Sequence, residues 1–300
     1  MSDYHTPVLL EESLEALAIE PSGVYVDATF GGGGHSAGIL RRLGPGGRLI
    51  AFDKDPEALA NAPEDKRLIL VHNNFRFVHN FVKYKGFDKV DGILADLGVS
   101  SHQFDTSERG FSFRFDAPLD MRMNPLSGRT AEELVNTLNE DDLERILRLY
   151  GEVEGSRRAA KLIFVARTHA RISTTGDLCK ALEPLLPPQQ EHKYLAKVFQ
   201  ALRIEVNGEM EDLRGLMEGA IKSLRSGGRM AVITYHSLED RIVKNYFKAG
   251  NIDGEVERDV MGRGESPFTL VNRKPVLPRE EEISGNTRAR SAKLRAAERR

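Results

Sequence analysis

The first hundred residues alternate between short continuous apolar runs and stretches with the apolar spacing of a helix. Four runs are rich in β-branched and aliphatic residues, and they fall at residues 24–28, 48–52, 68–72 and 92–95. Helical stretches between them include residues 36–43 and 56–62. Strands that alternate with helices across short turns predict an α/β fold built on a doubly wound parallel sheet.

The middle of the chain has a different pattern, because helical spacing continues there with almost no strand signal. Thr130 and Glu133 have the spacing of a capping box, and Asn139 precedes a helix that Gly151 ends. Further helices are predicted at residues 156–169, 177–185 and 193–205. We therefore predict a helical insertion domain over residues 106–206, after the strand that ends at Asp96.

The strand pattern returns after this insertion. A helix is predicted from about 209 to 224 and a strand from 229 to 234, with Ser226-Gly227-Gly228 between them. Two shorter strand candidates, at 268–272 and 275–277, precede a basic tail. The sheet domain is thus expected to comprise residues 1–105 and 207–300.

The composition argues against disulfide-bonded, cysteine-zinc and membrane-spanning classes of protein. The chain has 300 residues, 40% hydrophobic content, a formal net charge of −2 and a single cysteine, Cys179. One cysteine allows neither an internal disulfide nor a cysteine-based zinc site, and no apolar run approaches the ~20 residues of a membrane span. We expect a cytoplasmic protein with no metal and no membrane contact, and the sequence leaves a homodimer open.

Glycine residues dominate the segment that follows the first predicted strand. The run from Gly31 to Gly34, followed by His35, stands between a predicted strand and a predicted helix. Glycines let a ligand approach the backbone closely, and a helix N-terminus offers unpaired N–H groups. Asp53 ends the next strand about 20 residues later, where a carboxylate can accept both hydroxyls of a ribose. This pattern predicts a site for an adenosine-type ligand.

The loop favours S-adenosylmethionine over NAD, although both ligands present a ribose. A dinucleotide fingerprint would need glycine or alanine at the position of Ser36 and would lead a pyrophosphate onto the helix, whereas His35 occupies that approach. Asp27 adds a second acid near the pocket, and negative charge there opposes a pyrophosphate but tolerates a sulfonium. No Gly-Lys-Ser/Thr follows the glycines, which excludes a P-loop.

Two more strand ends are expected to face the same crevice. Phe75 follows the third strand and could lie against an adenine ring, although a phenylalanine of the core is an equally good interpretation. After the fourth strand, the segment from Asp96 to Gln103 is rich in hydrogen-bonding groups. We expect Asp96 and Gln103 to bind the methionine end of the cofactor.

Seven segments of the chain resemble the bacterial 16S rRNA (cytosine-N4)-methyltransferase family. They are residues 5–10 (HTPVLL), 27–36 (DATFGGGGHS), 96–101 (DLGVSS), 108–113 (ERGFSF), 118–123 (PLDMRM), 235–241 (YHSLEDR) and 290–295 (RSAKLR). The resemblance implies a Rossmann-like, class I S-adenosylmethionine-dependent methyltransferase with a helical insertion that recognises the substrate. It also implies N4-methylation of one cytidine in the decoding centre of the 16S rRNA of the small ribosomal subunit.

The resemblance carries seven residues over to the cofactor site, and they agree with the positions reached from the strand ends. These are Gly33, Gly34, His35, Asp53, Phe75, Asp96 and Gln103. The catalytic residue stays open, because the aromatic that many amino-methyltransferases carry after the fourth strand is missing here. Candidates for catalysis are Asp96, Ser100, His236 and Ser237, and candidates to hold the base are Phe111, Phe113, Phe115 and Tyr235.

Local charge must provide RNA binding in a chain whose net charge is slightly negative. The candidate patches are a helix region with Arg157, Arg158, Lys161, Arg167 and Arg171 and the tail with Arg288, Arg290, Lys293, Arg295, Arg299 and Arg300. For the helix, an ordinary solvated face is an equally good interpretation. Two other classes of protein stay open: an NAD-dependent dehydrogenase and an RNA-binding protein without activity.

Overall fold

The computed structural model describes residues 7–99, 106–256 and 264–300. The chain divides into two compact units, one formed by Met1–Gly98 with Met210–Arg300 and the other by Val99–Glu209. Each unit has its own cluster of buried apolar side chains. In these described ranges, no helix combines the length and the apolar character that a membrane crossing needs.

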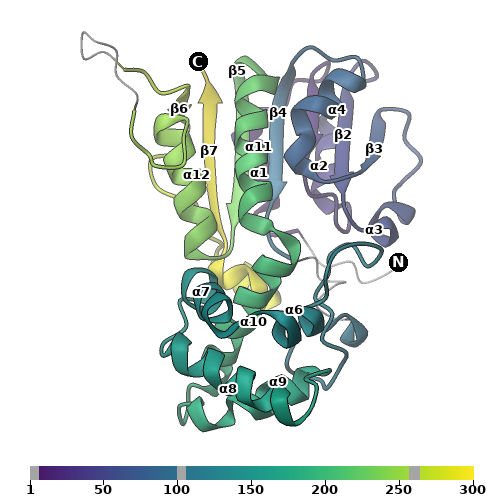
Figure 1. Cartoon of the computed structure of the whole chain (residues 1–300). Helices are drawn as coiled ribbons and strands as arrows, with labels where there is room; N and C mark the ends of the chain where they lie inside the picture. The colour runs from purple at the N-terminus through teal and green to yellow at the C-terminus, as the bar shows by residue number, and fades with distance from the viewer. Residues whose placement is uncertain (1–6, 100–105, 257–263) are drawn as a thin grey trace. The chain divides into compact units, whose positions relative to one another are not determined.

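A seven-stranded sheet forms the centre of the first unit (Figure 1), with the strand order β3-β2-β1-β4-β5-β7-β6. The strands are β1 Val24–Asp27, β2 Arg48–Asp53, β3 Leu68–His72, β4 Val90–Asp96, β5 Leu224–Thr234, β6 Phe268–Leu270 and β7 Lys293–Arg299. Strands β1 to β5 pair in parallel, and β7 is antiparallel to both of its neighbours. This arrangement is the Rossmann-like class I methyltransferase fold, as the sequence predicted.

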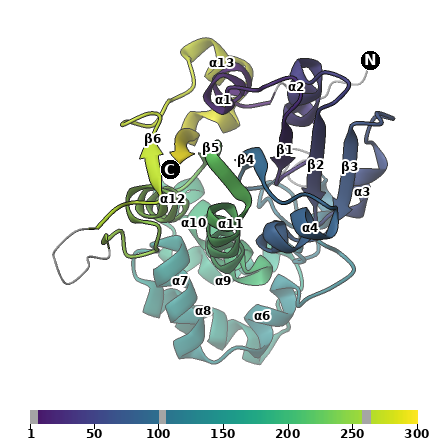
Figure 2. The ribbon, with the colours of Figure 1, turned by 90° about the horizontal axis from the view of Figure 1, so that it is seen from above.

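Helices cover both faces of this sheet (Figure 2). On one face lie α1 Leu10–Leu17 and α2 Gly34–Arg42, and on the other lie α4 Val78–Tyr84, α11 Glu209–Ser223 and α12 Ser237–Ala249. Because both faces are covered, the central strands β1 and β4 bury almost every residue. Shorter connecting elements are α3 Pro56–Ala60, α13 Glu280–Gly285 and the 3-10 turns η1 Phe75–Phe77 and η4 Thr287–Ser291.

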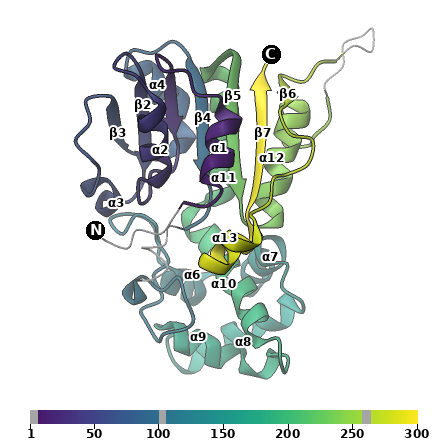
Figure 3. The same ribbon diagram turned by 180° about the vertical axis from the view of Figure 1, so that it is seen from behind.

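The segment expected to form a basic tail is instead a strand of the sheet. Figure 3 shows β7 beside β5, with which it pairs over six residues from Arg229↔Glu298 to Thr234↔Lys293. Leu294 and Ala296 enter the core, and the Arg295 guanidinium donates to both carboxylate oxygens of Asp240 at 2.6 and 3.1 Å. The prediction of a basic tail after the last strand is wrong, because basic side chains concealed the period-two pattern of strand β7.

The second unit is built from helices in its described part, with one isolated bridge between Pro118 and Thr174. Its elements are α6 Ala131–Thr137, α7 Glu140–Gly151, α8 Ser156–His169, α9 Thr175–Leu182, α10 Glu191–Asn207 and the 3-10 turns η2 Ser107–Arg109 and η3 Glu183–Leu185. The capping box of Thr130 with Glu133 and the cap by Asn139 are confirmed. The helix expected from residue 177 begins at Thr175, because Asp177 forms a further capping box with Thr174.

We predict that Asn207→Ala destabilises the helical unit. The Asn207 side chain accepts the Met123 N–H at 2.7 Å and donates to the carbonyls of Met121 and Arg203 at 2.8 and 2.9 Å. Truncation leaves these groups without their partner, so the free energy of unfolding in urea should fall by about 2 kcal/mol. Gln190→Ala is the control, because the Gln190 side chain makes no cap hydrogen bond on α10. Equal stability of the two variants would contradict the prediction.

Candidate active site

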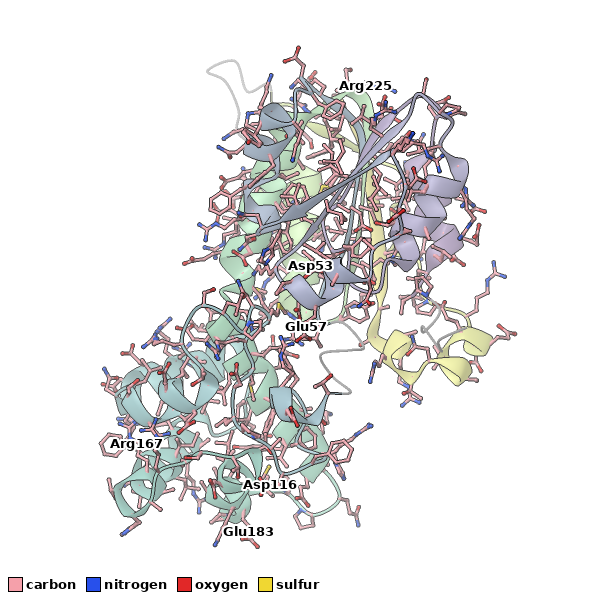
Figure 4. The ribbon with its side chains drawn as sticks, turned by 90° about the vertical axis from the view of Figure 1, so that its right-hand side faces the viewer. Asp53, Glu57, Asp116, Arg167, Glu183 and Arg225 are labelled. Atoms are coloured by element: carbon pink, nitrogen blue, oxygen red, sulfur yellow. The ribbon has the colours of Figure 1, made fainter. Side chains whose placement is uncertain are left out.

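Acidic side chains stand at the carboxyl ends of three neighbouring strands. Asp27 ends β1, Asp53 ends β2 and Asp96 ends β4. These strands are parallel and adjacent in the order β2-β1-β4, so their carboxyl ends share one edge of the sheet. Open α/β sheets bind their ligands at this edge. Figure 4 shows Asp53 there, near the short helix α3 that carries Glu57.

Two backbone N–H groups fix the orientation of the Asp53 carboxylate. Gly31 N–H donates to Oδ2 and Asp55 N–H donates to Oδ1, each at 2.8 Å. Burial raises the pKa of Asp53 above its ordinary value, and these two hydrogen bonds act in the opposite direction. A carboxylate has about four acceptor positions, so each oxygen keeps one lone pair for a ligand hydroxyl.

The glycine loop presents backbone rather than side chains at the start of α2. Gly33 has a φ of +76°, and a Cβ built there would lie 2.9 Å from Cζ of Phe30. A Cβ at Gly34 would lie 2.2 Å from Cγ of Pro7. Neither position has room for a side chain, which explains why the chain carries glycine at both.

Asp27 holds this loop against α2. The carboxylate has no exposed surface, and it accepts the Ser36 hydroxyl at 2.7 Å and the Thr29 N–H at 3.0 Å. Burial raises its pKa, and the nearby His35 and the two hydrogen bonds lower it. Asp27 therefore fixes the loop from within the protein instead of offering a carboxylate on the surface of the crevice.

Asp96 is partly exposed, as Asp53 is, with 24% of its side chain accessible. Its Oδ1 accepts the Tyr235 hydroxyl at 2.7 Å, and its Oδ2 lies 3.8 Å from Nδ1 of His35. The Asp96 N–H donates to the Thr29 hydroxyl at 2.7 Å, which ties the ends of β1 and β4 together. Burial raises the pKa of Asp96 to about 6, whereas His35 and the Tyr235 hydrogen bond lower it.

The segment after β5 is organised by Glu239. Its Oε2 accepts the Tyr235 N–H at 2.8 Å, and its Oε1 lies 3.2 Å from Nε2 of His236. His236 is also the N-cap of α12, since Nδ1 accepts the Glu239 N–H at 3.4 Å. His236 therefore has a structural role as the cap of α12, whereas Ser237, the first residue of that helix, is exposed.

The structure brings together most of the residues predicted for the cofactor site. The loop residues Gly33 and Gly34, with His35, Asp53 and Asp96, cluster at the strand ends through the contacts described above. His35 is 5% exposed, and its Nε2 lies 3.1 Å from the Val8 carbonyl oxygen, so this residue at the start of α2 is held within the protein. Phe75 follows β3 within η1. Ser100 and Gln103 lie outside the described residues.

Sequence reasoning missed an ion pair next to Phe75. The Lys54 ammonium pairs with the buried carboxylate of Asp212 in α11 and lies 5.7 Å from the centroid of the Phe75 ring. The Arg76 guanidinium is 3.6 Å from the same carboxylate. Lys54 directly follows Asp53, but nothing in the sequence indicates a partner 158 residues away.

The other residues proposed to hold a base have different environments. Phe111 is buried in the core of the helical unit, and Phe113 packs against Phe199 of α10 with ring centroids 5.2 Å apart. Phe115 is 56% exposed. Tyr235 is committed to Asp96 through its hydroxyl group.

Known proteins similar to this chain match it over almost its full length. The ribosomal RNA small subunit methyltransferase H of Bacteroides fragilis strain YCH46 is 55% identical over 297 residues, which cover 99% of this chain and 98% of that protein. The protein of the same name from Flavobacterium johnsoniae is 52% identical over 296 residues, with coverage of 99% and 98%.

Solved structures with a similar fold have much lower sequence identity to this chain. An rRNA methylase from Streptococcus thermophilus has 13% sequence identity and a TM-score of 0.44, over 100% of this chain and 99% of that one.

The family model described as the MraW methylase family matches residues 2–300. With that match across the chain and relatives more than half identical to it, the chain belongs to the MraW methylase family.

Proposed function

We propose that this protein transfers a methyl group from S-adenosylmethionine to the N4 amine of one cytidine in the decoding centre of the 16S rRNA. The 55% identity, over 99% of the chain, to a relative named ribosomal RNA small subunit methyltransferase H supports methylation of small-subunit rRNA. The choice of the N4 amine and of the decoding centre rests on the sequence motifs that resemble the (cytosine-N4)-methyltransferase family. The substrate is the small ribosomal subunit or its 16S rRNA, and the reaction takes place in the cytoplasm.

The residues at the strand ends fit such a cofactor. Asp53 has a lone pair on each oxygen for the two ribose hydroxyls, and Phe75 provides a ring for the adenine. Asp96 supplies a negative charge for the ammonium group, and Gln103 follows it in the chain. Gly33, Gly34 and His35 form the first turn of α2 and its cap. When bound, S-adenosylmethionine supplies an electrophilic methyl group on a sulfonium.

Alignment is the main task of the protein in this reaction. The lone pair of a cytosine amine is delocalised into the ring, so the amine must be held in line with the methyl group and sulfur. Positioning of this kind can supply about 7 to 11 kcal/mol of the barrier. The candidates to contact the amine are still Asp96, Ser100, His236 and Ser237. The Asp96 carboxylate is held by Tyr235 and is partly exposed, so it can accept a hydrogen bond from the cytosine amine.

The helical unit, which the sequence assigns to residues 106–206, is proposed to recognise the RNA. Arg157, Arg158 and Lys161 are exposed on α8, and within the described ranges they have no ion-pair partner. The other two cations of this patch are engaged, because Arg167 donates to the Val135 carbonyl and Arg171 pairs with Glu132. The N-terminal half of α8 therefore has the cations available for phosphates.

The first test concerns the reaction and its product. The protein is incubated with methyl-labelled S-adenosylmethionine and small subunits, or naked 16S rRNA, from a strain that lacks the gene. Nuclease-released nucleosides should carry the label in N4-methylcytidine. Label in another nucleoside would refute the proposed N4 position on cytidine. Absence of label with both substrates would refute the proposed methyl transfer.

The second prediction is that Asp53→Ala weakens binding of S-adenosylhomocysteine by more than about tenfold, or about 1.4 kcal/mol. The change removes the acceptors for the ribose hydroxyls and frees the loop from the Gly31 hydrogen bond. Glu64→Ala is the matched control, because Glu64 is an exposed acid of the same unit. If calorimetry gives equal affinities for both variants, the ribose is not bound by Asp53.

The third prediction is a pH dependence of S-adenosylhomocysteine binding. The pKa of Asp96 is about 6, so the carboxylate that attracts the ammonium group is present above this pH and is lost below it. Affinity should be nearly constant at pH 7 to 8 and fall by up to about tenfold for each pH unit below 6. Asp96→Asn should bind more weakly and without this dependence.

A conservative variant sharpens this test. Tyr235→Phe removes the hydrogen bond that lowers the pKa of Asp96, so the loss of affinity should begin at higher pH. Tyr84→Phe is the control, because Tyr84 is 79% exposed on α4. The groups that face Asp96 are His35 from α2, Asp27 from β1, and Tyr235 and Glu239 after β5. If the pH dependence survives in Asp96→Asn, one of these other groups is responsible.

A further inference from the structure

A second concave site lies on the first unit and is lined by residues of α12, of β7 and of the segment that includes β6. Figure 1 shows α12 beside β6 and β7, against which it packs. We call this site the cationic hollow. Its cations come from three separate segments: Lys244 and Lys248 of α12, Arg273 after β6, and Arg295 of β7. Phe247 and Leu270 provide its apolar part, and Leu270 is 44% exposed.

The charge of the cationic hollow is largely uncompensated. No carboxylate is among the residues that line it. Asp240 pairs with Arg295 from outside the lining, at 2.6 Å. Lys244, Lys248 and Arg273 are exposed and have no ion-pair partner in the parts of the chain that the structure describes. Three cations are therefore available to an anion.

The two lysines of the cationic hollow lie on α12 beyond its first turn, away from the edge where the strand-end acids lie. Helix α12 starts at Ser237, directly after the segment that follows β5, and its first turn is anchored by Glu239. At the rise of a helix, Lys244 and Lys248 lie about 10 and 16 Å further along α12. They are four residues apart, so their side chains share one face of the helix.

We propose that the cationic hollow binds backbone phosphates of the RNA substrate. Cations from three separate segments can contact more than one phosphate of a strand, and their charge is complementary to that of an RNA backbone. The exposed part of Leu270 adds a surface for a sugar between the phosphates. The proposal rests on the proposed function, because it takes RNA as the substrate, and it assigns part of the binding to α12, outside the helical unit.

The test compares the full-length protein with the triple variant Lys244→Gln, Lys248→Gln, Arg273→Gln. Affinity for a fluorescently labelled single-stranded RNA is measured by anisotropy at several salt concentrations. Removal of three phosphate contacts should lower the slope of log Kd against log salt by about 2, or about 0.7 for each contact. The KM for small subunits should rise at least tenfold at physiological salt, with kcat and the affinity for S-adenosylhomocysteine unchanged.

Two further variants serve as controls. Arg41→Gln with Lys66→Gln removes exposed cations elsewhere on the same unit and should leave the salt slope at the wild-type value. Lys244→Arg with Lys248→Arg keeps the charge and should retain RNA affinity. Normal binding of S-adenosylhomocysteine by every variant establishes that the fold is intact.

Two results would overturn the proposal. One is a triple variant with wild-type salt slope and KM. The other is saturable binding of inorganic triphosphate that the triple variant loses while its RNA affinity is unchanged, because the hollow would then take a free polyphosphate. The RNA-binding measurement needs no catalysis, so it is decided separately from the proposed methyl transfer.

Discussion

The parallel pairing of β2, β1 and β4 is the constraint on which the candidate active site depends. In this register Asp27 lies opposite Ala51 of β2 and Leu94 of β4, and Asp53 lies opposite His72 of β3. Parallel strands end on the same side, so residues far apart in the chain arrive at one edge. The glycine loop, the first turn of α2 and the segment after β5 are then built around these ends.

Burial of three acids would be costly without hydrogen-bond partners, and each acid has them. Asp27 accepts from Ser36 and Thr29, Asp53 from Gly31 and Asp55, and Asp96 from Tyr235. These donors are neutral N–H and O–H groups, which orient a carboxylate without cancelling its charge. The site therefore keeps the negative potential that suits a cationic ligand such as a sulfonium with an ammonium group.

The sequence predicted the elements whose signals are local. The helix expected at 156–169 is α8 Ser156–His169, and the strand expected at 68–72 is β3 Leu68–His72. The caps at Thr130 and Asn139 were predicted for the same reason, because a cap depends on residues three positions apart. Strand β5 begins at Leu224, earlier than predicted, although Ser226-Gly227-Gly228 has the composition of a turn.

The residues proposed for the cofactor site could be named from the sequence, since strand, glycine loop, helix and acid follow one another in order. Their partners were not, because Tyr235 lies 139 residues from Asp96, and Asp212 lies 158 residues from Lys54. Only the tertiary structure decided that the last residues form β7 and that Arg295 faces Asp240. Local patterning determined the elements whose signals lie within a few residues, and residue type determines which side chains carry charge. Which of those charges meet, and which stay free for a ligand, depends on the packing of segments distant in the chain.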